Sequence, residues 1–450
     1  MPEKFDLKKF SKNRTLINDI FSSKKKEAEV AGWIHNSRDL SKVKFIVLRD
    51  FSGIIQVTGI KGKTPENIFK DMEKIPRESV IYVKGKIVDS KQAPGGKEIN
   101  PEELIILNKS EELPIDIPLN AKDESTTELP KRLDWRSLSL RTKKSQITFK
   151  VQAKIVEGMQ EWLNKNGFIQ VFTPCIMGVP SESGSEVFEI KYYNGKAFLR
   201  QDPQLHRQLT VLGGLEKIYD IGPVWRAEKS HTIKHLTEHR VCAVEMAFID
   251  NEHDIMRLEE QVIISALKKV NEDCRKELEE LGIKLKIPSA PFPEVNFPEV
   301  YKILEKMGKK IKEGEDLDAE GEKLLWEYAQ KKYPGIDFYF LNKFPHKIKP
   351  FYVKGEKDSD YARSTDLYFR GMEMSSGGQR EEDHDTLMKN IKDRGLNPKS
   401  VEWFTKFFKY GAPTHGGFAI GIERITMILL GLQNVREAVL FPRDPERIVP

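Results

Sequence analysis

The chain has 450 residues, of which 39% are hydrophobic and 32% charged, and a formal net charge of +5. This length allows about two or three domains with ample core, and the composition is that of an ordinary soluble protein. The mild positive charge permits a nucleic-acid partner without arguing for one. Cys175, Cys242 and Cys274 are too scattered for a disulfide framework or a zinc site, and no apolar run approaches the ~18 residues of a membrane span. We expect a cytoplasmic protein without a membrane partner.

Residues 27–110 are predicted to form a small β-barrel, within a first domain that we place at 1–110. Short runs of alternating hydrophobicity follow one another there, and one helical stretch lies near Asn67–Lys74. Five short strands with one helix are typical of a closed barrel of the OB type. Phe45 and Gln56 are expected on adjacent strands, where an aromatic ring beside an amide can stack on and read unpaired bases. The alternative is that Phe45 belongs to the core.

A linker at residues 111–140 is predicted from its three prolines and a polar run. A strong helix follows, with Gly167 where a C-terminal cap belongs. Its apolar residues share one face: Ile147, Val151, Ile155, Met159, Trp162 and Leu163. The segment 168–174 after it is strand-like and stops at Pro174. This unit is compatible with ordinary core packing.

The remainder of the chain is predicted to be an antiparallel sheet flanked by helices. Strands and a tight helix fill 197–250, and strand-like segments return between 349 and 376 and at 417–423, before a closing helix at Ile425. Residues 252–345 look helical and charged, so we expect a helical insertion there. The whole is an α+β arrangement.

Arg226, Glu228 and His235 occur within about a dozen residues of one predicted hairpin, and a further arginine, Arg424, ends the glycine-punctuated segment 417–424. An arginine presents a planar, permanently charged fork to phosphate oxygens. A glutamate accepts from an exocyclic amine, and a histidine adds a further donor. Any one of these residues alone is equally explained by a surface salt bridge. Together they indicate a site for a nucleoside triphosphate.

In this order the motifs resemble the second and third signature motifs of class II aminoacyl-tRNA synthetases, and the helix–strand–proline unit resembles the first, which builds a dimer interface. Nearly the whole chain is similar to archaeal-type aspartyl-tRNA synthetases of class IIb. The most specific segments are Arg226-Ala-Glu-Lys-Ser, Lys234-His-Leu-Thr-Glu238, Ser376-Gly-Gly-Gln-Arg380 and Phe408–Phe418. The resemblance implies an anticodon-binding OB domain, a class II catalytic domain at 141–450, and a homodimer.

The resemblance also implies roles for individual residues. ATP would be bound by Arg226, Glu228, Lys234, His235, Leu236, His239, Glu373, Gly421, Ile422, Glu423 and Arg424. Arg226 on the α-phosphate and Arg424 on the outer phosphates would be catalytic, and Mg²⁺ would be ligated by Glu373 and Ser376. L-aspartate would be bound by Glu182, Gln204, Arg207, Arg226, Ser376 and Arg380. The implied reaction is attack of the aspartate carboxylate on ATP, followed by transfer from aspartyl-adenylate to tRNA without a covalent enzyme intermediate.

Four positions depart from the family pattern. Arg207 replaces a lysine that binds the aspartate carboxylate, Asp202 replaces a serine, and Ala243 stands where an acidic residue neighbours that lysine. His239 replaces the aromatic residue that stacks on adenine. We expect Asp202 to supply the missing carboxylate to Arg207, so that the count of charges in the pocket is unchanged.

Asparagine is the nearest rival substrate, because the segment around Arg380 looks more like asparaginyl enzymes. Arg207 and Arg380 together favour a carboxylate, since a second arginine beside a neutral amide would be buried unpaired. A paralogue that binds nucleotide or tRNA without charging it is a third possibility. The intact set of ATP residues speaks against that reading.

The resemblance places the anticodon contacts in the barrel, at His35, Arg38, Phe45, Gln56 and Pro94. His35 and Pro94 match the relaxed, nondiscriminating type rather than the strict type that carries Trp and Lys. A small ring and a proline lack the bulk and charge that would enforce one base. We therefore expect tRNA(Asp) and tRNA(Asn) both to be partners. The alternative is that His35 is merely a barrel-surface residue.

Overall fold

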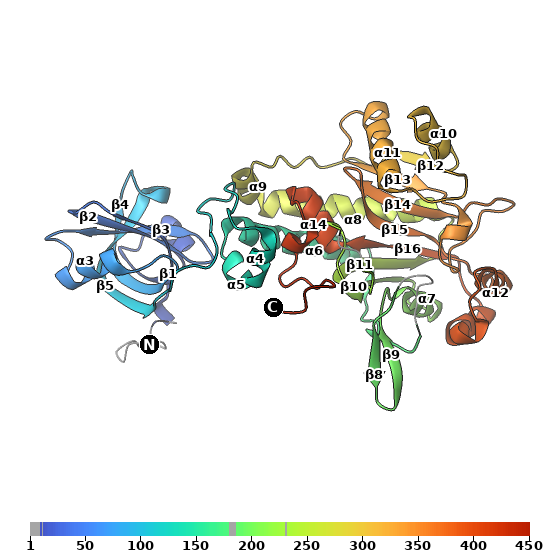
Figure 1. The fold of residues 1–450 in the computed structure, drawn as a ribbon, viewed down its shortest axis with the longest axis horizontal. Coiled ribbons are helices and arrows are strands. Elements are labelled where there is room, and N and C mark those ends of the chain that lie inside the picture. Colours follow the sequence, from blue (N-terminus) through green and yellow to red (C-terminus); the bar gives the residue numbers. More distant parts are fainter. Residues whose placement is uncertain (1–9, 11, 180–185, 230–231) are drawn as a thin grey trace. The chain divides into compact units, whose positions relative to one another are not determined.

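The computed structural model of the chain describes residues 10, 12–179, 186–229 and 232–450 (Figure 1). The chain divides into two compact units, residues 1–131 and 132–450. The division falls within the segment that the sequence indicates as a linker. Each unit has its own hydrophobic core.

The first unit contains a closed barrel with the strand order β1-β2-β3-β5-β4. All of its strand pairs are antiparallel except β3 with β5. Its elements are α2 (Ile17–Ser22), β1 (Glu27–Asp39), β2 (Val43–Arg49), β3 (Ile54–Ile60), α3 (Glu66–Lys74), β4 (Val80–Asp89), the 3₁₀ turn η1 (Pro94–Gly96) and β5 (Lys97–Asn108). The closed barrel, with α3 between its third and fourth strands, confirms the predicted OB-type fold.

The barrel core forms because alternate residues along each strand face inward. In β1, Ala28, Val30, Gly32 and Ile34 are buried, while the residues between them are partly exposed. Helix α2 adds Ile17 and Ile20, which are completely buried in the same core. The sequence does not predict α2, because six residues are too few for a helical period to be recognised.

The second unit is built on an eight-stranded sheet with the order β12-β13-β14-β15-β16-β11-β10-β6. The two outermost pairs are parallel and all the pairs between them are antiparallel. A separate sheet of three short strands has the order β7-β9-β8. Sheet and flanking helices together confirm the predicted α+β class.

The elements of this unit run in chain order from α4 to η5. The first half contains α4 (Leu129–Asp134), α5 (Arg136–Ser139), α6 (Lys143–Lys165), β6 (Ile169–Gln170), β7 (Ile176–Met177), β8 (Glu189–Tyr192), β9 (Gly195–Leu199), α7 (Gln204–Leu212), β10 (Lys217–Trp225), β11 (Glu238–Ala247), α8 (Glu252–Asp273) and α9 (Arg275–Leu281). The second half contains β12 (Glu294–Asn296), α10 (Glu299–Lys306), α11 (Ala319–Lys332), β13 (Phe338–Asn342), η2 (His346–Ile348), β14 (Ser364–Phe369), β15 (Met372–Gln379), α12 (His384–Asp393), η3 (Pro398–Val401), α13 (Glu402–Thr405), η4 (Lys406–Tyr410), β16 (His415–Gly421), α14 (Ile422–Leu430) and η5 (Val435–Ala438).

Helix α6 is the strong helix that the sequence predicts after the linker. The Thr142 hydroxyl caps it by accepting from the Ser145 N–H at 3.2 Å, and Gly167 follows its end with a φ of 79°. A Cβ on Gly158 would lie 2.8 Å from the Ala266 Cα, so glycine allows α6 and α8 to pack closely. Within the part of the chain that the structure describes, none of the helices is long and apolar enough to span a bilayer.

Residues 252–345, where a helical insertion is predicted, contain strands as well as helices. Helices α8 to α11 lie there, but so do β12 and β13, which extend the main sheet at one edge. The segment is thus continuous with the sheet, and Figure 1 shows α10 and α11 beside these two strands. Short, fully buried strands such as β13 lack the polar alternation that distinguishes a strand from a buried helical segment.

Candidate active site

A cavity of about 350 Å³ lies over the sheet of the second unit. Its walls come from α7, β10, β11, β15, β16 and the connection between β10 and β11. Most of the predicted ligand-binding residues line it, namely Gln204, Arg207, Arg226, Glu228, Lys234, His235, Leu236, His239, Glu373, Ser376, Arg380, Gly421, Glu423 and Arg424. Residues up to about 220 positions apart are therefore gathered at one site by the antiparallel pairing of β11 with β16 and of β15 with β16.

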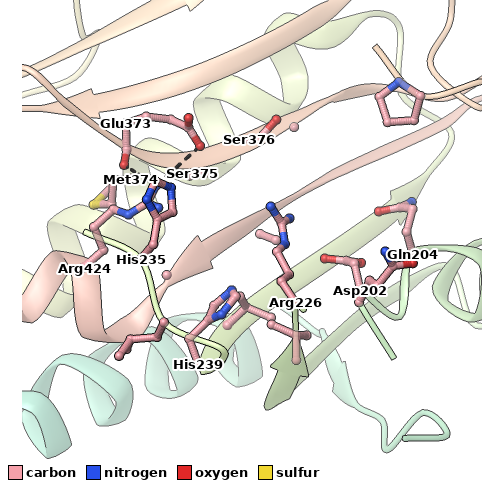
Figure 2. A pocket seen from close by; sticks show the side chains of 18 of the residues that line it. Asp202, Gln204, Arg226, His235, His239, Glu373, Met374, Ser375, Ser376 and Arg424 are labelled. Carbon is pink, nitrogen blue, oxygen red and sulfur yellow. Dashed lines mark hydrogen bonds and ion pairs between the residues drawn. The ribbon is translucent and has the colours of Figure 1, made fainter. Parts of the chain in front are cut away.

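Figure 2 shows Arg226 between two groups of polar side chains. His235, Glu373 and Arg424 lie on one side of it, and Asp202 and Gln204 on the other. The cavity thus has two ends with different chemistry. The first corresponds to the predicted phosphate end and the second to the predicted amino-acid end.

The phosphate end holds two arginines in different states. Arg424 Nη1 donates to the Glu373 carbonyl at 2.7 Å and lies 3.5 Å from the Glu373 carboxylate. Arg226 is 44% exposed, and its nearest carboxylate oxygen, on Glu228, is 3.9 Å away. The Arg226 guanidinium is therefore only loosely held and is available to an anionic ligand. Arg424 is pre-positioned by the strand edge at β15.

The two cavity histidines are held in their neutral forms. Burial, followed by the charges of Arg424 and Lys234, lowers the pKa of His235. Burial, with Arg226 and Arg424 nearby, lowers the pKa of His239 to about 3. A neutral imidazole adds no charge to the cavity and presents a flat ring, which suits the predicted stacking of His239 on adenine.

Two of the predicted ATP residues have other surroundings. Ile422 is buried at the start of α14 and does not line the cavity. Glu423 lines it, but its carboxylate accepts from the Arg240 N–H at 2.9 Å and lies 3.5 Å from the Arg240 guanidinium. Through these two contacts Glu423 holds the beginning of β11. Glu182 lies outside the described residues.

The amino-acid end is a buried network of charged groups. Arg380 donates from Nε to Glu245 Oε1 at 3.0 Å and from Nη2 to Gln204 Oε1 and the Gly417 carbonyl, each at 3.0 Å. Arg207 donates from Nη2 to Gln204 Oε1 at 2.6 Å, and its Nε is 3.6 Å from Glu245. Arg207 is 1% exposed, and its Nη1 has no hydrogen-bond partner among the described residues. That N–H is free for a ligand.

Glu245 is the centre of this network and was not predicted from the sequence. It is completely buried, and Gln204 Nε2 also donates to it at 3.0 Å. Burial alone would raise its pKa, but Arg380 and Arg207 outweigh burial and lower the pKa. The carboxylate is therefore ionised and neutralises one of the two arginine charges. Its strand is apolar on both sides, so a carboxylate at this point was a signal that could have been used.

The contact predicted between Asp202 and Arg207 is present. Asp202 Oδ1 lies 3.1 Å from Arg207 Nη2. Burial would lower the pKa of Arg207, but Asp202 and then Glu245 more than compensate and raise it. Ala243 lies on the same face of β11 as Glu245, in an apolar cluster with Val224, and carries no charge there. The loop before α7 thus supplies a carboxylate to Arg207.

A glycine allows the network to approach the sheet. A Cβ on Gly417 would lie 2.0 Å from the Val244 carbonyl and 2.4 Å from Glu245 Oε2. Any side chain at this position would therefore displace Glu245 or separate β11 from β16. The Gly417 carbonyl is thus free to accept from Arg380 Nη2.

Glu373 and Ser376 face the cavity from β15, as candidates for binding Mg²⁺. Asp366 on the neighbouring strand is paired with Lys349 at 2.9 Å, and burial raises its pKa to about 6. Among the described residues no group of three or more His, Cys, Asp or Glu side chains is arranged to hold a metal. This donor set fits Mg²⁺, which is held by one or two carboxylates while phosphates and water complete its shell.

Glu259 of α8 is a buried carboxyl beside Ser375 of β15, and burial raises its pKa to about 8. The native state therefore binds this proton more tightly than the unfolded state, whose carboxyl titrates near 4.5. Unfolding free energy should then fall as pH rises from about 4.5 to about 8 and stay level above that range. Glu259→Gln should match the parent at pH 5 and be more stable at pH 9, by on the order of 3–5 kcal/mol.

Thermal unfolding of both proteins at pH 5 and pH 9 measures this effect. Glu272→Gln is the matched control, because Glu272 is exposed on the same helix. Equal losses of stability between the two pH values in the parent and in Glu259→Gln would contradict the assignment.

The barrel residues predicted to contact the anticodon differ in exposure. Phe45 and Gln56 lie on the adjacent strands β2 and β3 and are partly exposed, as expected. Arg38 and Pro94 are exposed. His35 is buried, with its Nδ1 2.8 Å from the Arg49 guanidinium and its Nε2 2.9 Å from the Leu119 carbonyl. His35 is therefore not a barrel-surface residue. Its influence on the choice of anticodon base stays a prediction.

Comparison with known proteins covers both units. The family described as class II tRNA synthetases (D, K and N) matches residues 128–445, and the OB-fold nucleic acid binding domain matches residues 28–107. An aspartate–tRNA(Asp) ligase of Pyrococcus abyssi is 42% identical over 426 residues, which cover 94% of this chain and 96% of the relative.

Two further relatives differ in their named specificity. An aspartate–tRNA(Asp/Asn) ligase of Aeropyrum pernix is 39% identical over 443 residues, 96% of this chain and 99% of the relative. The crystal structure of the asparaginyl-tRNA synthetase of Pyrococcus horikoshii with asparaginyl-adenylate has a TM-score of 0.88 and 32% identity, with complete coverage of both chains. The similarity therefore extends along the whole chain. The relatives are named as enzymes for aspartate in two cases and for asparagine in the third.

Proposed function

Because this chain belongs to the class II tRNA synthetases (D, K and N), we propose that it is an ATP-dependent aspartate–tRNA ligase. It joins L-aspartate to tRNA through an aspartyl-adenylate and releases pyrophosphate and AMP. The relatives named as aspartate–tRNA ligases, at about 40% identity over nearly the full length, support this assignment. The substrate-binding roles of individual residues are part of the proposal.

ATP binds at the end of the cavity that carries Arg226, His235 and Arg424. Arg226 is loosely paired and half-exposed, so its guanidinium is free to clasp the α-phosphate. Arg424 of α14 is held against β15 by the Glu373 carbonyl and binds the outer phosphates. The aspartate α-carboxylate attacks the α-phosphorus in line. Catalysis comes from alignment and from charge stabilisation at the phosphorus, so no protein nucleophile is needed.

Mg²⁺ would be held by Glu373 and Ser376 and would neutralise charge on the phosphate oxygens. The protein's own contribution there is to keep Glu373 oriented. Arg424 does this through its contacts with the Glu373 carbonyl and carboxylate.

The observation that carries aspartate, rather than asparagine, is the pair of buried arginines. Glu245 and Asp202 balance the two positive charges of Arg207 and Arg380, but one buried N–H group of Arg207 still has no hydrogen-bond partner among the described residues. A ligand carboxylate can accept a charge-assisted hydrogen bond from this Arg207 Nη1. A neutral amide has one oxygen acceptor instead of two, and its N–H groups find no acceptor on a guanidinium.

The nucleic-acid partner is proposed to be tRNA, recognised in part by the barrel. Exposed Arg38 and Pro94 and half-exposed Phe45 and Gln56 offer charge, an aromatic ring and an amide to unpaired bases. Named relatives include both tRNA(Asp) and tRNA(Asp/Asn) ligases. Pro94 lacks the bulk and charge that would enforce one anticodon base, so we propose that both tRNAs are charged.

We also propose a homodimer. Ile169, Phe172 and Ile176 follow α6 and are 50%, 84% and 47% exposed. Adjacent exposed apolar side chains of this size favour burial against another protein surface. They belong to the helix–strand–proline unit that resembles the first class II motif.

Charging assays test the whole proposal. Aspartate and asparagine are each offered with purified tRNA(Asp) and tRNA(Asn), and amino-acid-dependent pyrophosphate exchange is measured alongside. Aspartate should support exchange and be attached to both tRNAs, whereas asparagine should do neither. Exchange with asparagine alone would replace the assignment by an asparaginyl enzyme. Exchange with neither amino acid would leave a non-charging paralogue, and failure on tRNA(Asn) alone would refute the relaxed specificity.

A further inference from the structure

The loop formed by residues 232–237 carries three cavity residues, and two remote segments hold it. One is the C-terminal segment after α14. The Val435 N–H donates to the Ile233 carbonyl at 2.9 Å, and the Thr237 N–H donates to the Arg443 carbonyl at 3.0 Å. These contacts fix both ends of the loop but none of its cavity side chains.

The second contact holds a cavity side chain directly. Lys234 Nζ donates to Glu322 Oε2 at 3.0 Å, and Glu322 lies on α11, 88 residues away. The two side chains are 27% and 16% exposed, so this pair is less screened than an ordinary surface salt bridge. Tyr368 Oη donates to the other Glu322 oxygen at 3.4 Å. The carboxylate is thus itself oriented, by a residue of β14 that pairs with Glu373 of β15.

This geometry leaves Lys234 with unused donors at the cavity. An ammonium group has three N–H bonds, and the described contacts account for the one that Glu322 accepts. A free lysine side chain loses substantial rotamer entropy when it binds a phosphate, and fixing it beforehand removes that loss from the binding step. The negative charge of Glu322 also balances Lys234 while no anion is bound.

We propose that Glu322 is a positioning residue that presents Lys234 to the phosphate tail of ATP. The inference rests on the proposed function, because it needs ATP in this cavity. It gives the segment that contains α10 and α11 a part in nucleotide binding, although neither helix lines the cavity. Glu322 acts only through Lys234, and that dependence is what the experiment examines.

The first measurement is nucleotide affinity. Glu322→Gln keeps the shape of the side chain but removes its charge, and it should raise the KM for ATP in pyrophosphate exchange by ~5-fold to 20-fold. The KM for aspartate and kcat should stay within about twofold of the parent. Calorimetric titration with a non-hydrolysable ATP analogue should show the same loss of affinity. This second readout separates failure of the inference from failure of the proposed reaction, because it needs no amino acid.

A double-mutant cycle supplies the decisive test. In a Lys234→Met background, Glu322→Gln should have no further effect on ATP affinity, because the group that it positions is gone. The matched control is Glu320→Gln on the same helix, where Glu320 pairs with Lys309 at 2.6 Å in an exposed position, and it should leave the KM for ATP unchanged.

Three results would overturn the inference. They are an additive effect in the Lys234→Met background, an unchanged or lower KM for ATP in Glu322→Gln, and an equal effect of Glu320→Gln. Glu322→Asp withdraws the carboxylate by one methylene while keeping its charge. It should give an intermediate KM, and it serves in place of the glutamine variant if that protein does not fold.

Discussion

Arg226→Ala is expected to reduce pyrophosphate exchange by about a thousand-fold or more while leaving the melting temperature almost unchanged. The Arg226 guanidinium is 44% exposed, and its one described ion pair, with Glu228, is 3.9 Å long. Removing it therefore takes little from the folded protein. The charge that it stabilises exists only when ATP is bound and reacting, so the loss falls on catalysis.

Arg424→Ala should abolish exchange as well, for a second reason. Arg424 also holds the Glu373 backbone and carboxylate, so its loss disturbs the proposed Mg²⁺ ligand too. Arg275→Ala is the control, because Arg275 pairs with Glu279 on an exposed helix face away from the cavity. Exchange within a few-fold of the parent in Arg226→Ala would remove that residue from the site, and a collapse of the melting temperature would assign it a structural role instead.

The second large effect is expected in the aspartate pocket. Asp202→Ser and Arg207→Lys should each raise the KM for aspartate by about 10-fold to 100-fold. Asp202 orients Arg207 at 3.1 Å, and a lysine in its place lacks the planar fork that reaches both Gln204 and a ligand. The triple variant Asp202→Ser, Arg207→Lys, Ala243→Asp should recover much of the loss. It moves the carboxylate to the face of β11 that carries Glu245, where the family places it.

Pyrophosphate exchange at varied aspartate concentration measures this series, with the KM for ATP as the internal control. The KM for ATP should stay within about twofold throughout, because the substitutions lie at the other end of the cavity (Figure 2). Losses that simply add across the three positions would mean that they are independent substitutions. The compensation between Asp202, Arg207 and Ala243 would then be wrong.

Features with a local period could be predicted from the sequence. The barrel strands and α6 show regular alternation or a helical stripe along a few turns, and both were found where expected. The hairpin that brings Arg226 to His235 is likewise local. The cavity itself was predicted only through the resemblance, because nothing in the spacing of Gln204 and Arg380, 176 residues apart, reveals that they meet.

The residues that hold the ligand-binding groups were missed because their partners are distant in the chain. Glu245 meets Arg380 across 135 residues, and Glu322 meets Lys234 across 88. Within its own segment, neither glutamate is marked by a motif or spacing that predicts its partner. Ile422 shows the opposite case, because it was carried over with its motif although its side chain lies in the core, and its contact with ATP stays a prediction. Sequence motifs identify the groups that face a ligand more readily than those that support them.

The closed charge network at the amino-acid end has a consequence for the evolution of specificity. Glu245 and Asp202 balance Arg207 and Arg380 in one network, where Gly417 leaves no room for a further side chain. Replacing any one of them alone leaves a buried charge without its partner, which costs about 3–5 kcal/mol. A lineage that exchanges aspartate for a neutral amino acid must therefore change several of these positions together, or pass through a destabilised intermediate.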